Sequence, residues 1–296
     1  PFFMWNHVCN AFVRNDGRPM VAMAATLFSS LFNIVFDYVL MYPLGMGMAG
    51  AALATACSPI VGILICLTHL LSGRSRLHFS WIRPSVRRLV RGCQVGVSAF
   101  VGEISSGVTT AVFNFLILGL AGNTGVAAYG VVANLSLVAV AMFNGIAMGT
   151  QPLVSDFYGR GEHPAIRRVI RMGMELSLVF ALLIVVVIWS YTAPIIAVFN
   201  KSGDTQLAAY ATEGLRLYML GFFFAGWNIS GSSIFSAMEQ ARAAFLTSVL
   251  RGFVMIVLCA LVLAALFGMT GVWLAFPAAE ALTLIVTLWY MKRVFA

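Results

Sequence analysis

The positions of the arginines constrain this chain more than any other feature. Apart from Lys201 and Arg216, the 18 Lys and Arg residues fall in every second gap between long apolar runs. The basic clusters are Arg14 and Arg18; Arg74, Arg76, Arg83, Arg87, Arg88 and Arg91; Arg160, Arg167, Arg168 and Arg171; Arg242 and Arg251; and Lys292 and Arg293. A water-soluble protein has no reason to sort charge by alternate loops, whereas a polytopic membrane protein keeps Lys and Arg on its cytoplasmic side. The pattern therefore predicts both the class of protein and its orientation.

The composition predicts the same class. Of the 296 residues 61% are hydrophobic and 9% are charged, whereas about 25% are charged in a typical soluble domain. Because so few charges cannot cover a water-facing surface, we expect the lipid bilayer to be the main partner. The net charge of +8 does not indicate nucleic-acid binding, since the basic residues lie at the ends of apolar segments and form no separate basic domain.

Eight apolar segments are long enough to cross a bilayer, which takes roughly 20 helical residues. They run over residues 20–42, 48–71, 93–121, 126–157, 169–200, 206–238, 243–267 and 271–291. Residues 1–12 are apolar but too short to span, and the opening segment lacks the pattern of a signal peptide. We expect an all-α polytopic membrane protein with eight full helices plus part of one, and a chain that is the remainder of a longer protein.

A weak internal repeat predicts how these helices are grouped. Residues 11–16 and the pair Gly45-Met46 align with residues 234–239 and the pair Gly268-Met269, and residues 50–54 resemble residues 271–275. The repeat implies two six-helix lobes of the same orientation, because six is an even number of crossings. The chain then divides into the end of the first lobe (1–72), a basic cytoplasmic linker (73–92) and the second six-helix lobe (93–296).

Acidic residues inside the predicted spans are candidates for function, since an ionisable group at mid-bilayer costs about 2.5–3.5 kcal/mol on the mildest scale. Glu103 lies ten residues past Cys93, or about 15 Å along a helix, which is the midplane. Glu280 reaches a similar depth from the opposite face, and Asp37 lies close to the outer surface. Glu103 and Glu280 are therefore candidate ion-coupling residues, and for Glu280 a structural role stays equally open.

Polar residues at helical spacing extend from these acids along single helix faces. The stripes are Glu103, Ser106, Thr110 and Asn114; Thr26, Ser30, Asn33 and Asp37; and Glu280, Thr283 and Thr287. Hydrogen bonds between helices would explain each Ser, Thr or Asn singly. A water-filled substrate cavity would explain them together, with a lining of Asp37, Asn33, Ser106, Thr110, Asn114, Asn134, Asn144, Gln151 and Asn228.

The remaining motifs point to no enzyme chemistry. Residues 45–50 match a dinucleotide-binding pattern, but no strand is predicted before them and no acid follows at the required spacing. The five cysteines form no Cys-x-x-Cys pair and the four histidines no His-Glu-x-x-His motif, so no metal site is predicted. Since no phosphate-binding loop occurs, we expect neither ATP hydrolysis nor a cofactor.

Four segments carry motifs of a known family. Residues 145–155 read GIAMGTQPLVS and residues 156–161 read DFYGRG; residues 127–130 with Asn134, and residues 271–277 (GVWLAFP), form a second set. A third set is residues 14–18 with Asn33, Asp37 and residues 50–52. The first set resembles the Gly-x-x-x-Gly-x-Gln-Pro and Tyr-Gly segment of the MATE (multidrug and toxic compound extrusion) family, the second its MepA-like branch, and the third the end of its first lobe. The resemblance covers essentially the whole chain.

The resemblance implies a twelve-helix, two-lobe secondary antiporter in the cytoplasmic membrane of a bacterium. Such a protein expels lipophilic, often cationic compounds in exchange for protons or sodium ions, and it needs neither a cofactor nor an ATPase subunit. The NorM-like branch pairs a glutamate on helix seven with an aspartate on helix ten. Glu103 falls on the helix-seven position, but residues 217–238 contain no acid. This departure disfavours a two-carboxylate sodium site and favours protonation of Glu103.

Two other functions stay open beside the antiporter. A lipid-linked oligosaccharide or polysaccharide flippase has a similar architecture, but it should line its cavity with Arg or Lys to hold phosphorylated head groups. Interior acids outnumber interior bases in this sequence, which favours cationic cargo. A membrane scaffold or channel is disfavoured because it needs no acid at mid-bilayer.

Overall fold

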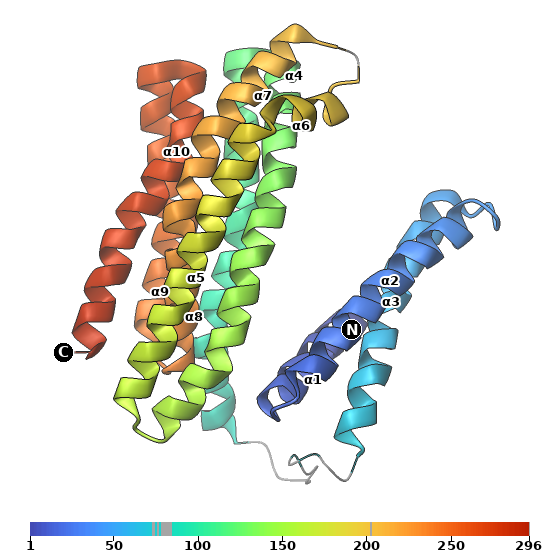
Figure 1. Ribbon diagram of the computed structural model, residues 1–296, viewed down its shortest axis with the longest axis vertical. Helices are drawn as coiled ribbons and strands as arrows, with labels where there is room; N and C mark the ends of the chain where they lie inside the picture. The colour runs from blue at the N-terminus through green and yellow to red at the C-terminus, as the bar shows by residue number, and fades with distance from the viewer. Residues whose placement is uncertain (73–74, 76, 78–84, 202, 296) are drawn as a thin grey trace. The chain divides into compact units, whose positions relative to one another are not determined.

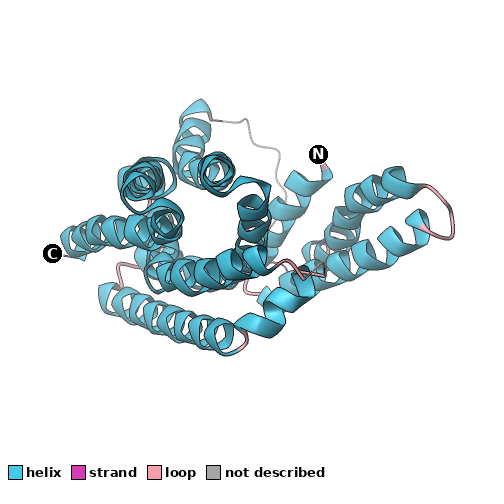
Figure 2. Cartoon of the chain, turned by 90° about the horizontal axis from the view of Figure 1, so that it is seen from above, coloured by secondary structure: helices cyan, strands magenta, loops and turns pink. Residues whose placement is uncertain are grey.

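The fold is entirely helical over the part of the chain that the computed structural model describes, residues 1–72, 75, 77, 85–201 and 203–295 (Figure 1; Figure 2). Five helical runs in this part are long and apolar enough to cross a membrane: Pro19–Met41, Gly47–Leu70, Val86–Gly159, His163–Ser190 and Ala241–Val294. The expected all-α polytopic class is confirmed. The chain separates into two compact units, Pro1–Arg83 (unit 1) and Pro84–Ala296 (unit 2).

Unit 1 is built from α1 (Phe2–Asn15), α2 (Pro19–Met41) and α3 (Gly47–Leu70). Its buried apolar core is small and comprises Cys9, Val13, Ala22, Ala25 and Cys66. Helices α2 and α3 approach closely at Gly50, where a Cβ would lie 2.9 Å from the backbone of Leu40. A glycine at this position therefore lets the two helices pack with their backbones nearly in contact.

A buried polar cluster joins the opposite end of α3 to the turn between α1 and α2. Nε2 of His69 lies 2.8 Å from Oδ2 of Asp16, and the Ser75 hydroxyl donates to the same oxygen over 3.0 Å. Both side chains of the His–Asp pair are almost fully buried. The cluster ties the last turn of α3 to the turn that begins α2.

Unit 2 begins with α4 (Val86–Gly159), α5 (His163–Ser190) and the short α6 (Thr192–Phe199). The next segment is formed by α7 (Thr205–Tyr218), the 3-10 turn η1 (Met219–Gly221) and α8 (Phe222–Ala237). The last part comprises α9 (Ala241–Val249), the π-helix η2 (Leu250–Val254) and α10 (Met255–Phe295).

The two longest helices of unit 2 each reverse at a glycine. Gly122 in α4 and Gly268 in α10 have positive φ values of 63° and 60°, a conformation that glycine adopts without strain. The rings of Phe113 and Tyr129 lie 5.4 Å apart across the first reversal, although a straight helix would separate these residues by about 24 Å. Each long helix therefore supplies two antiparallel segments, and unit 2 has the six segments expected of the second lobe.

The core of unit 2 is rich in aromatic side chains. Phe113, Tyr129, Phe143, Tyr218, Phe222, Trp273 and Phe276 are buried, and they come from α4, α7, α8 and α10. Tyr218 stacks on Phe276 with ring centroids 4.3 Å apart. Close approach again depends on glycine, since a Cβ on Gly226 would lie 2.6 Å from the ring of Phe143. Phe222 of α8 also packs against Phe276 of α10, with ring centroids 5.3 Å apart, and this contact fixes α8 against α10, the helices that carry Asn228 and Glu280.

Two polar contacts join segments of unit 2 that are far apart in the sequence. Arg91, near the start of α4, pairs with Glu239 in the turn between α8 and α9. Thr270, just after the reversal of α10, donates a hydrogen bond to Glu213 of α7. The start of α4 and the α8–α9 turn therefore lie at one end of the unit, as the alternating arginines require.

Candidate functional site

A buried polar cluster lies inside unit 2, at the meeting of α8, η2 and α10. Glu280 on α10 is 3% exposed, and its Oε1 accepts a hydrogen bond from Nε of Arg251 over 2.5 Å. Its Oε2 accepts a second bond from Nδ2 of Asn228, over 2.7 Å. The same Asn228 nitrogen also lies 2.8 Å from the backbone oxygen of Glu280. Both carboxylate oxygens of this intramembrane acid are thus satisfied.

The polar stripe predicted beyond Glu280 extends the cluster along α10. Thr287 donates to Oδ1 of Asn228 over 2.8 Å, so the asparagine amide is held at both ends. Thr283 and Thr287 are fully buried, and each also bonds a backbone oxygen four residues earlier in α10. This stripe faces the neighbouring helices of unit 2, which is the packing role that the sequence left open.

The backbone around Arg251 explains how an arginine reaches this depth. Arg251 lies in η2, a single π-helical turn, and such turns place an extra residue in an otherwise α-helical run. The next residue, Gly252, packs directly on α4, where an added Cβ would lie 1.9 Å from Oγ of Ser105. Only glycine fits at such an approach.

This placement corrects the predicted position of Arg251. The alternation of charge grouped it with Arg242 as part of a basic cytoplasmic gap, but the structure has it inside the predicted span 243–267, paired with Glu280. The signal was present in the sequence, because an arginine eight residues into an apolar run is costly without a partner.

The stripe that begins at Glu103 has different surroundings. Glu103, Ser106 and Thr110 are exposed on the first half of α4, and Asn114 is half-buried. Thr110 bonds the backbone oxygen of Ser106 in its own helix. Within the described part of unit 2, no residue is seen to pair with Glu103. The structure therefore does not bring Glu103 and Glu280 into one contact network.

The remaining predicted cavity residues fall in both units. Asn134, Asn144 and Gln151 are exposed on the second half of α4, and Asn134 bonds the backbone oxygen of Gly130 in its own helix. In unit 1, Asn33 donates to Oγ1 of Thr55 over 3.4 Å. Oδ1 of Asp37 is buried, and no described residue bonds to it. A cavity lined by all of these residues stays a prediction.

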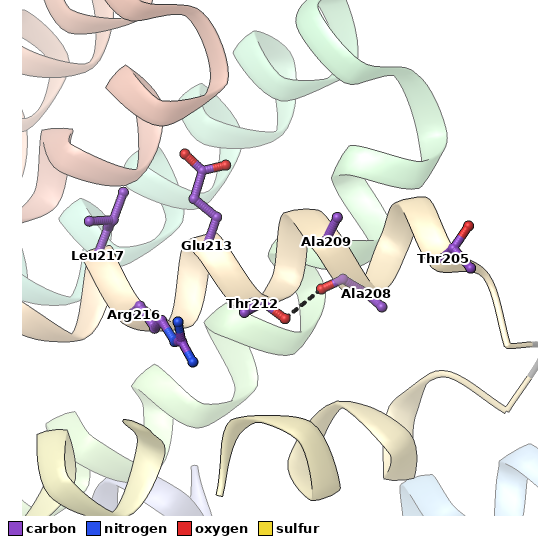
Figure 3. Close-up of a pocket in the computed structure, with 7 residues that line it drawn as sticks. All are labelled: Thr205, Ala208, Ala209, Thr212, Glu213, Arg216 and Leu217. Atoms are coloured by element: carbon purple, nitrogen blue, oxygen red, sulfur yellow. Dashed lines mark hydrogen bonds between the residues drawn. The ribbon is translucent and has the colours of Figure 1, made fainter. Parts of the chain in front are cut away.

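A surface depression of about 620 Å³ lies elsewhere, along α7. Figure 3 shows Glu213 and Arg216 pointing to opposite sides of this helix, with Thr212 bonded to the backbone oxygen of Ala208. None of the predicted site residues lines this depression. Over the described residues, no cluster of three or more His, Cys, Asp or Glu side chains could hold a metal ion.

Comparisons with known proteins give a consistent result. A model of the MatE family matches residues 99–261, more than half of the chain. The multidrug export protein MepA of Staphylococcus saprophyticus is 28% identical over 284 residues, which are 95% of this chain and 62% of the relative. The MepA of Staphylococcus haemolyticus is 27% identical over 274 residues, covering 92% and 60%. The chain thus spans about three-fifths of the length of these relatives.

Solved structures share the fold. The crystal structure of a MATE protein in complex with MaL6 has a TM-score of 0.92 at 22% identity, covering 99% of this chain and 67% of that chain. The outward-facing conformation of a multidrug resistance MATE family transporter of the MOP superfamily has a TM-score of 0.91 at 22% identity, covering 98% and 65%.

Proposed function

The chain belongs to the MatE family, and from that membership we propose that the protein containing it is a secondary active efflux antiporter. It would expel lipophilic or cationic compounds in exchange for protons or sodium ions. The names of its relatives, multidrug export proteins, support the export of several compounds. The apolar helices and these relatives make the chain part of a multi-pass protein of the cytoplasmic membrane.

The observation that carries this proposal is the exposed position of Glu103 on a membrane-spanning helix of unit 2. A carboxylate at this depth cannot face hydrocarbon at low cost. Its charge must therefore be compensated by water, by a group outside unit 2 or by a bound proton. A carboxylate that is compensated in one of these ways can exchange its partner, as an ion-coupling residue must. The neighbouring Ser106 and Thr110 extend the polar surface along the same helix face.

Exchange then follows from competition at one carboxylate. An ion bound to Glu103 and a cationic compound in the same cavity would exclude each other, so the gradient of the ion would drive the compound in the opposite direction. Rocking of the lobes would then expose the carboxylate to each side of the membrane in turn.

Glu280 is less suited to carry an ion. Both of its carboxylate oxygens are engaged, one by Arg251 and the other by Asn228. Releasing a proton or sodium ion at each cycle would require these buried contacts to break and re-form. The contacts favour Glu280 as a positioning residue for Arg251, with Glu103 as the residue that binds the ion.

Transport by the full-length protein in liposomes tests this function, with pH and sodium gradients imposed separately. Glu103→Gln keeps the shape of the side chain but cannot ionise. We expect this variant to insert normally and to export a fluorescent lipophilic cation no faster with a gradient than without one. Glu162→Gln makes the same change in the exposed turn between α4 and α5, and it should leave efflux at the wild-type rate. Full gradient-driven efflux by Glu103→Gln would place the coupling site elsewhere.

A further inference from the structure

Arg216 is one of the two basic residues that lie outside the alternating clusters. It stands on α7 three residues after Glu213, whose carboxylate accepts a hydrogen bond from Thr270 just past the reversal of α10. Arg216 therefore lies near the end of unit 2 where the long helices reverse, opposite the end that holds the basic turns. An arginine within an apolar span needs either a partner or access to the membrane surface.

The guanidinium of Arg216 is seen to pair with no described residue of unit 2. Glu213 is at the right spacing for an ion pair along the helix, but its carboxylate is bonded to Thr270 instead. Figure 3 shows the two side chains on opposite sides of α7. Arg216 is exposed, so its charge is available to a ligand that approaches from outside unit 2.

Arg216 lines the depression of about 620 Å³ that runs along α7 from Thr205 to Leu217. The start of this helix cannot attract an anion into the depression, because Asp204 already caps it. The Asp204 carboxylate accepts hydrogen bonds from the backbone N–H groups of Gln206 and Leu207. An anion in the depression would therefore be held by the arginine side chain and not by the helix terminus.

The helix beside Arg216 has two faces with different side chains. The buried face of α5 carries the small residues Gly173, Ser177 and Ala181, which are typical of close packing between membrane helices. Another face carries large exposed apolar side chains, among them Leu182, Val186 and Trp189. Large apolar side chains at helical spacing indicate a surface that contacts acyl chains, since close helix packing favours small ones.

Aromatic side chains place Arg216 at the depth of the lipid head groups. Trp189 near the end of α5 and Tyr191 in the break before α6 are both exposed. Tryptophan and tyrosine are enriched at this level of a membrane. Nε1 of Trp189 donates a hydrogen bond to the backbone oxygen of Arg216 over 3.2 Å. The free cation is thus next to the upper end of the lipid-facing surface of α5.

We propose that Arg216 binds the phosphate of an outer-leaflet phospholipid whose acyl chains lie on the exposed face of α5. The guanidinium fork matches two phosphate oxygens and can donate parallel hydrogen bonds to them. Glu213 also lines the depression, and its carboxylate disfavours an anion with more than one charge. A phosphodiester therefore suits the site better than inorganic phosphate.

The choice of the outer leaflet follows from the predicted orientation, in which the basic turns face the cytoplasm. The assignment does not depend on the proposed export function, because it concerns the lipid-facing surface of unit 2. Its test therefore measures lipid binding and not transport.

A fluorescent label in the depression can detect a lipid bound there. Ala209 is exposed and lines the depression two turns from Arg216, about 10 Å along the helix. Ala209→Cys is introduced into the full-length protein without its native cysteines, and the purified protein is labelled with bimane in detergent micelles. The label is titrated with phosphatidylcholine that carries a nitroxide quencher on its head group. A diacylglycerol that carries the same nitroxide without the phosphate is the matched lipid.

Adding Arg216→Gln to the labelled protein should raise the concentration of the phospholipid that gives half-maximal quenching. We expect an increase of about 10-fold to 100-fold, as loss of a charged hydrogen bond predicts, and no change for the phosphate-free lipid. Arg216→Lys keeps the charge without the fork and should lose part of the affinity. Lys201→Gln removes the exposed cation of the turn before α7 and should leave both values unchanged.

A second label measures quenching by lipids that contact the protein without a site. Phe267 is exposed at the reversal of α10, and bimane attached to Phe267→Cys should be quenched equally with and without Arg216→Gln.

Three results would overturn the assignment. The first is equal quenching of the Ala209 label by the phospholipid in the presence and absence of Arg216→Gln. The second is an equal loss of quenching by both lipids in that variant, which would indicate altered packing of α7. The third is reversal of the quenching by millimolar inorganic phosphate, because the site would then bind free anions and not a lipid.

Discussion

Two glutamates inside unit 2 have opposite surroundings. Glu280 is buried and shared between Arg251 and Asn228, whereas Glu103 is exposed on α4 and no described residue of the unit is seen to pair with it. Neutralising Glu103 removes a charge with little change in packing. Changing either Arg251 or Glu280 alone leaves a buried charge without its partner. The resulting loss of stability is far larger than the stability that the intact pair contributes.

Truncation of Arg251 tests this difference. We expect Arg251→Ala to destabilise unit 2 by about 3–5 kcal/mol, because Glu280 then stays buried without its counter-ion. Adding Glu280→Gln to that variant should restore part of the loss, since an amide needs no counter-ion. Thermal unfolding of the detergent-purified protein measures both, with Arg242→Ala as the control. A midpoint for Arg251→Ala equal to that of the control would show that the pair contributes little.

The residues of the site were only partly predictable. Helical spacing predicts that Glu280, Thr283 and Thr287 lie on one face of their helix, turned away from lipid. Spacing alone does not show whether that face lines a cavity or packs against another helix. The pairing of Arg251 with Glu280 depends on a π-helical turn, which has no periodic signature in sequence. Glu103 is exposed and no described residue of unit 2 is seen to pair with it, so no pattern within its own helix defines its surroundings.

At the scale of elements, apolar length predicted the segments well and their interruptions poorly. The predicted spans 93–121 and 126–157 flank the reversal at Gly122, as observed. The predicted span 169–200 is instead divided at Tyr191 into α5 and α6. Pro194 explains this break, because proline lacks an amide hydrogen and clashes with the preceding helical turn, so it is tolerated only near a helix start.

The helical turn η2 packs tightly on α4 at Gly252. A methyl group on Gly252 would overlap both Oγ and Cβ of Ser105, so the helices would have to separate. We expect Gly252→Ala to lower the unfolding temperature and to slow efflux, since the separation also displaces the neighbouring Arg251. Gly102→Ala on α4 is a matched control, because an added Cβ there meets nothing within 4 Å. Equal unfolding temperatures for the two variants would contradict the close packing.

At the scale of the whole molecule, the family resemblance carried by residues 145–161 and the all-α, two-lobe fold are confirmed. The division at residues 73–92 stays a prediction, and half of that linker lies outside the described residues. Charge alternation succeeded because it sums over many loops, so one misplaced arginine, Arg251, did not change the result. The role of a single site residue cannot be predicted from a sum over many positions, because one contact decides it.

The orientation in the membrane is the last prediction. The contact between Arg91 and Glu239 places the start of α4 and the α8–α9 turn at one end of unit 2, and both segments are basic or flanked by arginine. Because arginines are retained in the cytoplasm, we expect Gln240 to face the cytoplasm and Asn123, at the reversal of α4, to face outward. Single cysteines at these two positions, on a background without the five native cysteines, can be labelled in intact cells with a membrane-impermeant maleimide. The Asn123 position should react at once and the Gln240 position only after the cells are opened. The reverse order would invert the topology and place the basic turns outside.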